Sequence, residues 1–431
     1  MRVLVEPSEY LLSNAGDSAM LQVALARMRK MWPDATIQVL TDDPARLATY
    51  CPQIEPMAAD GRHAWVNCCA VHPRIYRHLP GKLRVLSRVI QRTLRRSWPG
   101  MARQSARLSL RPLALIDLKG LDRYLDAISN ADLVIATGMG GLTDTFPQYA
   151  FGLLETIDLA AAKGKTTALV GQGIGPLARP DLVAIAKRVL PKVDFISLRE
   201  GLYGLPLLRM LGVSQERVVT TGDDAIEMAY ERRGASGGNH LGINVRRAYY
   251  SAITSTDIDN LRAVIIKVVQ TLRCPIVSLP VSQSPEDSDS QSFSDLLQGH
   301  ADYSDNGACI LTPIELIDQI RRCRLVITGS YHAGVFALAQ GVPTIGLVGN
   351  AYYGQKFDGL AHQFGMGCEV IMVDEDGFQE KLGSMIIRMW TMAEGMRPQL
   401  LDRAERQVSS SRAAYEALNR MVRSRIATRS P

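Results

Sequence analysis

Short apolar runs rich in β-branched residues alternate with helical patterns along nearly the whole chain. This alternation is typical of parallel sheets covered by helices on both faces, so it predicts an α/β fold. Because single hydrophobic cores stop growing near about 250–300 residues, the 431-residue chain is expected to form two domains. Strands are expected at residues 3–6, 36–41, 133–137, 166–172, 195–198, 218–221, 241–245, 275–279, 308–311, 325–328, 344–348 and 370–373.

A polar, glycine-rich stretch at residues 231–239 shows no periodicity and separates the two sets of strands. The first domain is therefore expected at residues 1–232 and the second at residues 240–390. Residues 391–431 have a helical pattern and are expected to pack back on the first domain. Two doubly wound, Rossmann-like domains that face a cleft, followed by a returning helix, are the glycosyltransferase-B plan, which is an analogy of fold alone.

Charge is unevenly distributed. The net charge is +6, yet residues 61–116 contain no Asp or Glu, and they are expected to form a basic helical insertion. Within it, residues 82–98 predict an amphipathic helix, with apolar positions Leu83, Leu86, Ile90 and Leu94 and basic positions Arg88, Arg92 and Arg95.

Such a helix is typical of a surface that lies on an anionic membrane or binds a pyrophosphate-bearing lipid carrier, which would place a peripheral membrane contact at residues 74–112. A solvated helical hairpin is the alternative. A nucleic-acid partner is not expected, because no known reading module accompanies the charge.

The composition indicates an ordinary cytoplasmic protein, with the inner membrane face as a possible peripheral location. No run approaches the roughly 18 uninterrupted apolar residues of a membrane span, and Met1 leads directly into the first expected strand without a signal sequence. The seven cysteines are scattered without C-x-x-C spacing, so we expect reduced thiols, no metal and no cofactor.

Three glycine-containing turns follow expected strands of the first domain: residues 14–17, 138–144 and 171–176. Crevices at the carboxyl ends of strands are where α/β domains bind ligands, although Asn14 or Asp17 could equally cap the helix that follows. The glycine turns fit neither G-x-G-x-x-G nor the P-loop spacing, so the sequence does not predict dinucleotide or ATP binding.

Residues 325–343 form the strongest candidate for chemistry. An expected buried strand leads to a short polar turn, a helix begins near His332, and Gly341-Val342-Pro343 ends that helix. The N-terminus of a helix favours phosphate or carboxylate groups, and histidine exchanges protons near neutral pH. His332 is therefore the first candidate for catalysis, and a structural histidine is the alternative.

The chain carries six motifs at residues 14–17, 131–144, 171–176, 197–200, 222–225 and 330–332. In this order they resemble the polysaccharide pyruvyl transferase family, and together they span most of the chain. Members of that family resemble glycosyltransferase-B enzymes in fold, and they transfer the pyruvyl group of phosphoenolpyruvate to a sugar, usually as a cyclic ketal, with release of phosphate. The matching segments are Asn14-Ala15-Gly16-Asp17, Ala131 to Asp144, Gly171-Gln172-Gly173-Ile174-Gly175-Pro176, Ser197-Leu198-Arg199-Glu200, Gly222-Asp223-Asp224-Ala225, and Ser330-Tyr331-His332 with Lys356 beyond it.

The resemblance implies that His332 is the catalytic histidine and that Arg246 and Arg247 lie where the family places a donor-binding arginine. Family members commonly carry arginine two residues before the histidine, where this chain has Ser330. Arg246, Arg247 or the helix N-terminus would then supply the missing positive charge. The donor side is expected to comprise Arg246, Arg247, Ser330, Tyr331 and Lys356, and for the cations a solvated surface charge is the alternative.

The acceptor implied by the resemblance is a sugar or lipid-linked oligosaccharide, a precursor of an exopolysaccharide or another glycan. Asp17 and Asp144 are candidates for holding or deprotonating it. The other residues expected on the acceptor side are Asn14, Gly140, Gly141 and Arg199.

Two other functions fit the same architecture. A glycosyltransferase that uses a nucleotide sugar commonly holds the ribose with a carboxylate on the helix after the donor turn, but residues 333–340 contain no Asp or Glu. A non-catalytic scaffold could keep the fold and bind an anionic glycan or a membrane through the basic insertion.

Overall fold

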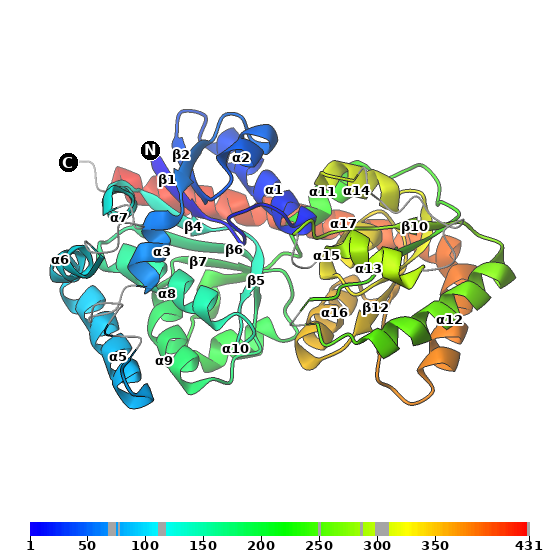
Figure 1. Cartoon of the computed structure of the whole chain (residues 1–431). Coiled ribbons are helices and arrows are strands. Elements are labelled where there is room, and N and C mark those ends of the chain that lie inside the picture. The colour runs from blue at the N-terminus through cyan, green and yellow to red at the C-terminus, as the bar shows by residue number, and fades with distance from the viewer. Residues whose placement is uncertain are drawn as a thin grey trace.

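The chain forms two parallel β-sheets, each covered by helices, and the two sheets lie side by side in space (Figure 1). The computed structural model describes residues 1–67, 75, 78–110, 118–248, 251–284, 288–297 and 310–428. The strands of the first sheet lie within residues 2–220 and those of the second within residues 240–372. The predicted α/β fold with two sheets is therefore confirmed.

The first sheet has the strand order β3-β2-β1-β4-β6-β7-β8, and β5 pairs with β6. Its strands are parallel, and apolar clusters cover both of its faces, as expected for a sheet between two helical layers. Strand β1 pairs with β2 on one side and with β4 on the other. The direction in which successive strands are added therefore reverses between β1 and β4, which is the switch point of this sheet. The strands are β1 (Arg2–Glu6), β2 (Thr36–Thr41), β3 (Glu55–Ala58), β4 (Leu133–Ala136), β5 (Met139–Leu142), β6 (Thr166–Ile174), β7 (Phe195–Leu198) and β8 (Val218–Thr220).

Helices pack on both faces of this sheet. They are α1 (Ala15–Met31), α2 (Pro44–Tyr50), α3 (Asp60–Asn67), α7 (Leu118–Asn130), α8 (Pro147–Ala162), α9 (Pro180–Val189) and α10 (Gly204–Met210), with short 3-10 turns at Leu190–Lys192 and Gln215–Arg217.

The second sheet has the order β10-β9-β11-β12-β13, which is the doubly wound arrangement 2-1-3-4-5. Its switch point lies between β9 and β11, where ligands bind in such sheets. The strands are β9 (His240–Asn244), β10 (Ile276–Ser278), β11 (Cys323–Thr328), β12 (Thr344–Val348) and β13 (Cys368–Met372), and the helices are α12 (Ser255–Leu272), α13 (Asp289–Leu296), α14 (Pro313–Ile320), α15 (Tyr331–Ala339) and α16 (Ala351–Phe364).

Among the described residues, the strand predictions have one error and two omissions. Residues 308 and 309 of the expected strand at 308–311 lie outside the described residues, and Ile310 and Leu311 are not in a strand. The edge strand β3 was not predicted, because its sequence Glu-Pro-Met-Ala is exposed and lacks an apolar alternation. Strand β5 was not predicted because two of its four residues are glycine.

The long helix α17 (Phe378–Ala427) follows the second sheet and runs behind both sheets (Figure 1). Near its start, the Trp390 carbonyl accepts a hydrogen bond of 2.9 Å from Arg324 on β11. Further along, Tyr415 donates a 2.8 Å hydrogen bond to buried Asp224, which precedes α11 (Ala225–Glu231). Helix α17 therefore contacts both the first and the second expected domain. The exact limits expected for these domains stay a prediction.

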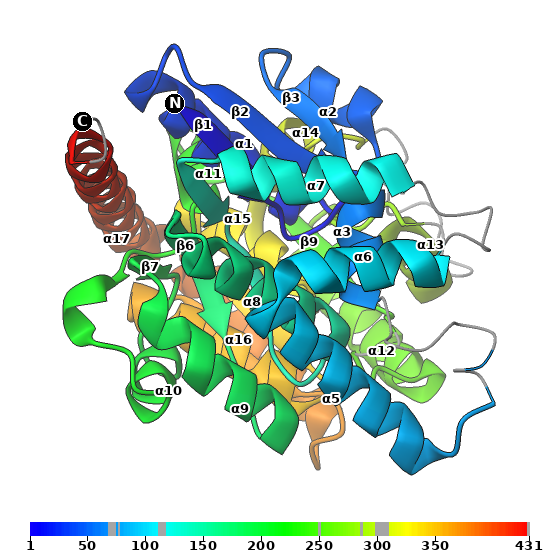
Figure 2. The same cartoon turned by 90° about the vertical axis from the view of Figure 1, so that its left-hand side faces the viewer.

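In the described part of the basic insertion, α3 is followed by α5 (Gly81–Ser97) and α6 (Pro99–Leu110), which lie at the outer end of the first sheet (Figure 2). Helix α5 turns a polar face inward, because Gln91 and Arg95 are buried and both Arg92 and Arg95 form ion pairs with Glu155 on α8. Its expected apolar positions Leu83, Leu86 and Ile90 face outward and are about half exposed, at 47%, 52% and 45%.

Part of the expected membrane-contact segment lies outside the described residues. These are residues 74, 76, 77, 111 and 112 and the side chains of Val85, Arg88, Arg96, Pro99, Leu108, Ser109 and Leu110.

Candidate active site

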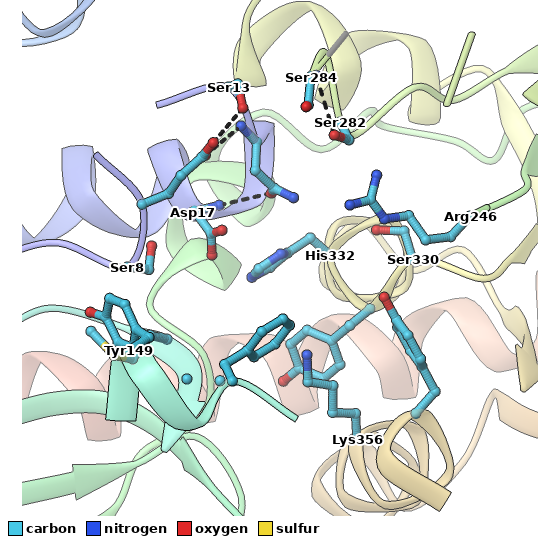
Figure 3. A pocket seen from close by; sticks show the side chains of 18 of the residues that line it. Ser8, Ser13, Asp17, Tyr149, Arg246, Ser282, Ser284, Ser330, His332 and Lys356 are labelled. Atoms are coloured by element: carbon cyan, nitrogen blue, oxygen red, sulfur yellow. Dashed lines mark hydrogen bonds between the residues drawn. The ribbon is translucent and has the colours of Figure 1, made fainter. Parts of the chain in front are cut away.

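A pocket of about 310 Å³ lies where the two sheets face each other (Figure 3). One wall comes from the loop after β1, from β5 and from α1, and includes Ser8, Asp17 and Gly140. The opposite wall comes from the segments after β9 and β11 and from α16, and includes Arg246, His332 and Lys356. The pocket therefore joins the switch points of both sheets, where doubly wound folds bind ligands.

The start of α1 is tied directly to the second domain at the rim of this pocket. The amide of Ala15 donates to the Val281 carbonyl at 2.8 Å, and the amide of Gln283 donates to the Ser13 carbonyl at 3.0 Å. The side chain of Asn14 caps the helix by accepting hydrogen bonds from the amides of Gly16 and Asp17. Capping fixes the first turn of α1, so Asp17 points into the pocket (Figure 3).

His332 lies in the first turn of α15 with its imidazole between the two domains. Its Nε2 atom lies 3.8 Å from the Oδ2 atom of Asp223, and neither atom has a hydrogen-bond partner among the described residues. Burial holds the pKa of His332 well below 6.5, and the nearby cations Arg199 and Lys356 lower it further. The imidazole is therefore neutral at physiological pH.

Two cations, Arg199 and Lys356, lie next to each other beside Gly140. The guanidinium of Arg199 stacks on the ring of Tyr331 at 4.1 Å and lies 3.6 Å from Asp223. A Cβ atom on Gly140 would come within 2.8 Å of the Arg199 Nη2 atom and 3.0 Å of the Lys356 Cε atom, so glycine at this position leaves the space that both side chains occupy. Burial, followed by the charge of Arg199, holds the pKa of Lys356 well below 10.5.

A third cation, Arg246, lies beside Ser330 in the pocket (Figure 3). Its Nη1 atom donates a 3.1 Å hydrogen bond to Asp289, which also accepts from the amides of Val281 and Ser282. Because Asp289 is 2% exposed, this network fixes the arginine in one position. Arg246 thus brings a guanidinium to the turn in which the chain has serine at position 330.

Asp17 is the acidic group that faces these cations across the pocket. Burial raises its pKa from 3.8 to about 7, and the charge of Glu9 raises it as well, whereas Lys356 and Arg199 oppose the shift. Burial also raises the pKa of Asp223, to about 6, against the influence of Arg199. The pocket therefore combines a neutral imidazole, a carboxyl that titrates near pH 7 and a dense group of cations, which suits proton transfer next to an anionic ligand.

The structure brings nine of the twelve predicted site residues into the lining of one pocket: Asn14, Asp17, Gly140, Gly141, Arg246, Ser330, Tyr331, His332 and Lys356. Arg199 lies one layer behind them, between Tyr331 and Gly140.

Two predicted residues lie elsewhere. Asp144 accepts hydrogen bonds from the amides of Ala178 and Arg179, so its carboxylate organises a neighbouring loop. Arg247 points away from the pocket and forms a partly exposed ion pair of 2.8 Å with Asp295.

Several residues of the site were not predicted. Tyr149 from α8 and Tyr352 and Tyr353 from α16 supply aromatic walls, and Asp289 supports Arg246 from outside the pocket. Asp223 belongs to a motif noted in the sequence, but its place beside His332 depends on a contact between residues more than one hundred positions apart.

Gly16 provides a sharp test of the contact between the domains. A Cβ atom at this position would lie 1.9 Å from the Cγ atom of His332, so Gly16→Ala must displace either α1 or the imidazole. We expect kcat of the reaction catalysed in this pocket to fall by about 100-fold or more, since misplacing a catalytic group by about 1 Å can lower the rate that much. The matched control is Gly395→Ala on α17, where a Cβ atom meets nothing within 4 Å. Equal activities of the two variants, measured by steady-state kinetics, would refute this packing.

The comparisons with known proteins agree with this architecture. A model of the polysaccharide pyruvyl transferase family matches residues 14–350. No curated protein matches the chain.

Similar solved structures include a putative UDP-N-acetylglucosamine 2-epimerase from Listeria monocytogenes, with 12% identity, coverage of 99% of this chain and 97% of that one, and a TM-score of 0.58. The UDP-GlcNAc 2-epimerase from Neisseria meningitidis bound to UDP-GlcNAc shares 11% identity, with coverage of 97% and 99% and a TM-score of 0.56. Arabidopsis thaliana UGT89C1 complexed with UDP-L-rhamnose shares 11% identity, with coverage of 98% and 98% and a TM-score of 0.56. The fold is therefore the two-domain, Rossmann-like glycosyltransferase-B type.

Proposed function

The chain belongs to the polysaccharide pyruvyl transferase family, and on that premise we propose that it transfers the pyruvyl group of phosphoenolpyruvate to a sugar of a glycan precursor. The observation that carries the proposal is the convergence of His332, Asp17, Arg246 and Lys356 on one pocket at the switch points of both sheets. A further cation, Arg199, lies one layer behind this pocket. A small, highly charged donor and a neutral sugar need this combination of dense positive charge and proton-transfer groups.

The cations Arg246, Lys356 and Arg199 support binding of the donor. Phosphoenolpyruvate carries a carboxylate and a phosphate, and guanidinium groups bind such anions through paired, charge-assisted hydrogen bonds. The free end of α15, where Ser330 and Tyr331 begin the helix, adds backbone N–H groups and a partial positive charge. In this assignment Arg246 takes the role that the family commonly gives to an arginine at the position of Ser330.

His332 protonates the donor in this proposal. A bound anion offsets the charges of Arg199 and Lys356, which lower the pKa of the imidazole, so donor binding favours uptake of a proton by His332. The imidazolium gives that proton to the methylene carbon, which becomes a methyl group, and the adjacent carbon becomes electrophilic. A sugar hydroxyl then forms a bond to that carbon.

Asp17 accepts the proton of the attacking hydroxyl. A second hydroxyl attacks the same carbon, the carbon–oxygen bond to phosphate breaks, and the ketal forms. Neutral His332 takes up the proton of this second hydroxyl, and Asp17 returns its proton to the departing phosphate. Protons thus balance over the cycle, which consumes one phosphoenolpyruvate and one sugar diol and releases one phosphate.

A glycosyltransferase reaction is the second candidate, because solved structures of similar fold are described as bound to UDP-L-rhamnose or UDP-GlcNAc. Helix α15 carries no carboxylate that could hold a ribose, which favours the pyruvyl donor. Thermal unfolding of the protein with each ligand separates the two candidates, because a ligand that binds the native state raises the unfolding temperature. We expect stabilisation by phosphoenolpyruvate and none by UDP-GlcNAc or UDP-glucose, and the reverse pattern would reject the proposal.

We also propose that the protein lies at the inner membrane face through the basic insertion, where it would meet lipid-linked acceptors. Within the part of the chain that the structure describes, every helix is too short or too polar to cross a bilayer. Helix α5 instead exposes an apolar face next to the basic residues Lys82 and Arg84. The large apolar side chains exposed on this part of the surface are Ile75, Leu83, Leu86, Val89, Ile90, Trp98 and Met101.

Replacing three of these side chains should release the protein from lipid. Full burial of each is worth about 1.5–3 kcal/mol, so we expect L83S/L86S/I90S to weaken binding to vesicles of phosphatidylglycerol and phosphatidylcholine by about tenfold or more. The matched control is L202S/I387S/M392S, which removes apolar side chains of similar exposure elsewhere. Vesicle flotation gives the measurement, and equal binding of both variants would contradict the membrane contact.

A further inference from the structure

A second cavity, of about 520 Å³, adjoins the active-site pocket. The two share the residues Phe146 and Tyr149, which therefore form the partition between them. The second cavity is bordered by α3 and by the first turn of α8, and its polar lining includes His63 and Gln148. The described residues that line it include no Asp or Glu.

The aromatic wall of this cavity is held rigidly. Buried Arg62 forms an ion pair of 2.8 Å with Glu6 at the end of β1, and its guanidinium lies over the rings of Tyr10 and Tyr149 at 5.4 and 5.6 Å. The hydroxyl of Tyr149 donates a 2.8 Å hydrogen bond to the Pro7 carbonyl. Burying an ion pair carries a large desolvation cost, and here the pair fixes two tyrosine rings that both border the cavity.

We propose that this second cavity is a saccharide subsite, so that the acceptor is a glycan of at least two sugar units. Flat aromatic rings provide apolar surface for the C–H faces of a pyranose, while side-chain donors and acceptors at the rim bind its hydroxyls. The assignment of the reacting sugar to the neighbouring pocket rests on the proposed function. The next sugar then passes the ring of Tyr149 and occupies the space beside His63 and Gln148.

The position of the cavity also gives the glycan a direction. Val66 lines the cavity, and its carbonyl accepts a 3.1 Å hydrogen bond from Arg95 of α5. Arg95 also lies over the ring of Trp65 on α3, so α3 and α5 are joined directly behind the cavity. A glycan that fills both cavities therefore extends from His332 toward the basic insertion.

The proposal can be tested by binding alone, without any transfer reaction. Saturation-transfer NMR titrations would compare cellobiose with methyl β-glucoside, β-1,4-galactobiose with methyl β-galactoside, and β-1,4-mannobiose with methyl β-mannoside. We expect at least one disaccharide to bind about tenfold more tightly than its partner. His63→Ala and Gln148→Ala should each reduce this ratio about three- to tenfold. The matched control, Gln53→Ala, alters a separate cavity of about 410 Å³ on the same domain and should keep the ratio unchanged.

Two results would overturn the subsite. One is that none of the three disaccharides binds more tightly than its methyl glycoside. The other is that the preference persists in both cavity variants. The subsite and the proposed donor can fail separately. If His63→Ala and Gln148→Ala reduce a preference for disaccharides while phosphoenolpyruvate does not raise the unfolding temperature, the subsite is supported and the proposed donor is rejected.

Discussion

Replacing His332 with alanine is expected to lower kcat for pyruvyl transfer by about 10³-fold, within the range of about 10²–10⁴ that general acid catalysis contributes. The imidazole lies 3.8 Å from Asp223 and close to the charges of Arg199 and Lys356. Among the described residues its Nε2 atom has no hydrogen-bond partner that would explain its position. Steady-state release of phosphate measures the effect. Because binding depends on Arg246, Lys356 and Arg199, the Kd for phosphoenolpyruvate should change much less than kcat.

The matched control is His362→Ala, which removes an exposed histidine near the end of α16. It should retain wild-type activity. His332→Gln preserves most of the side-chain volume and separates loss of proton transfer from collapse of the pocket. A folded His332→Gln protein that keeps wild-type kcat would exclude the histidine from the chemistry.

Asp17→Asn is expected to lower kcat/KM for the acceptor by about 10²–10³-fold, because an amide cannot accept the hydroxyl proton. In the wild-type protein the carboxyl has a pKa of about 7, raised first by burial. The fraction that can act as base therefore increases with pH, so Asp17 should give kcat/KM a rising limb up to about pH 7. Because the reaction also needs a protonated His332, kcat/KM should fall again at higher pH. Measuring kcat/KM from pH 5 to 9 tests this. A wild-type profile that is flat through pH 7, or unchanged in Asp17→Asn, would remove Asp17 from the role of base.

The same substitution should stabilise the fold, because burial opposes the ionised form of this carboxyl. The carboxyl ionises near pH 3.8 in the unfolded chain but near 7 in the folded one, so its ionisation favours unfolding between these values. Above about pH 7 the full penalty is present, and below pH 3.8 it vanishes. Since Asp17 is only partly buried, the penalty is smaller than the pKa shift alone implies, and we expect Asp17→Asn to gain about 1–2 kcal/mol at pH 8 and less at pH 5. A loss of stability at pH 8 in urea unfolding would contradict this.

The sequence was sufficient to predict the fold because buried parallel strands have a strong local signal. It also predicted that His332 follows a buried strand at the start of a helix, and the structure places it there. Such a position lies at the edge of a doubly wound sheet where ligands bind. The strands that were missed, β3 and β5, lack that signal because one is exposed and the other is half glycine.

The individual site residues were harder to predict, because position along the chain does not determine the direction of a side chain in an irregular segment. Arg246 and Arg247 are neighbours, yet Arg246 turns inward to Asp289 and Arg247 turns outward to Asp295. Asp144 follows the glycine turn as expected, but two amides of a separate loop bind its carboxylate.

Contacts over long sequence separation also left no local pattern. Asp223 meets His332 through the packing of two domains, and Gly16 is required only because the imidazole lies against it. Such contacts follow from the assembled fold, whereas the signals of strands and helix starts are contained in short windows of sequence.

The most direct test of the proposed reaction is to incubate the purified protein with phosphoenolpyruvate labelled with ¹⁴C in the pyruvyl carbons, together with a panel of disaccharide acceptors, and to separate the neutral and acidic sugars. We predict a labelled, acid-labile ketal formed in equal amount to released phosphate, and its absence with His332→Gln. If label stays in phosphoenolpyruvate while UDP-sugars yield glycosidic product, the protein is a glycosyltransferase and the proposed donor is wrong.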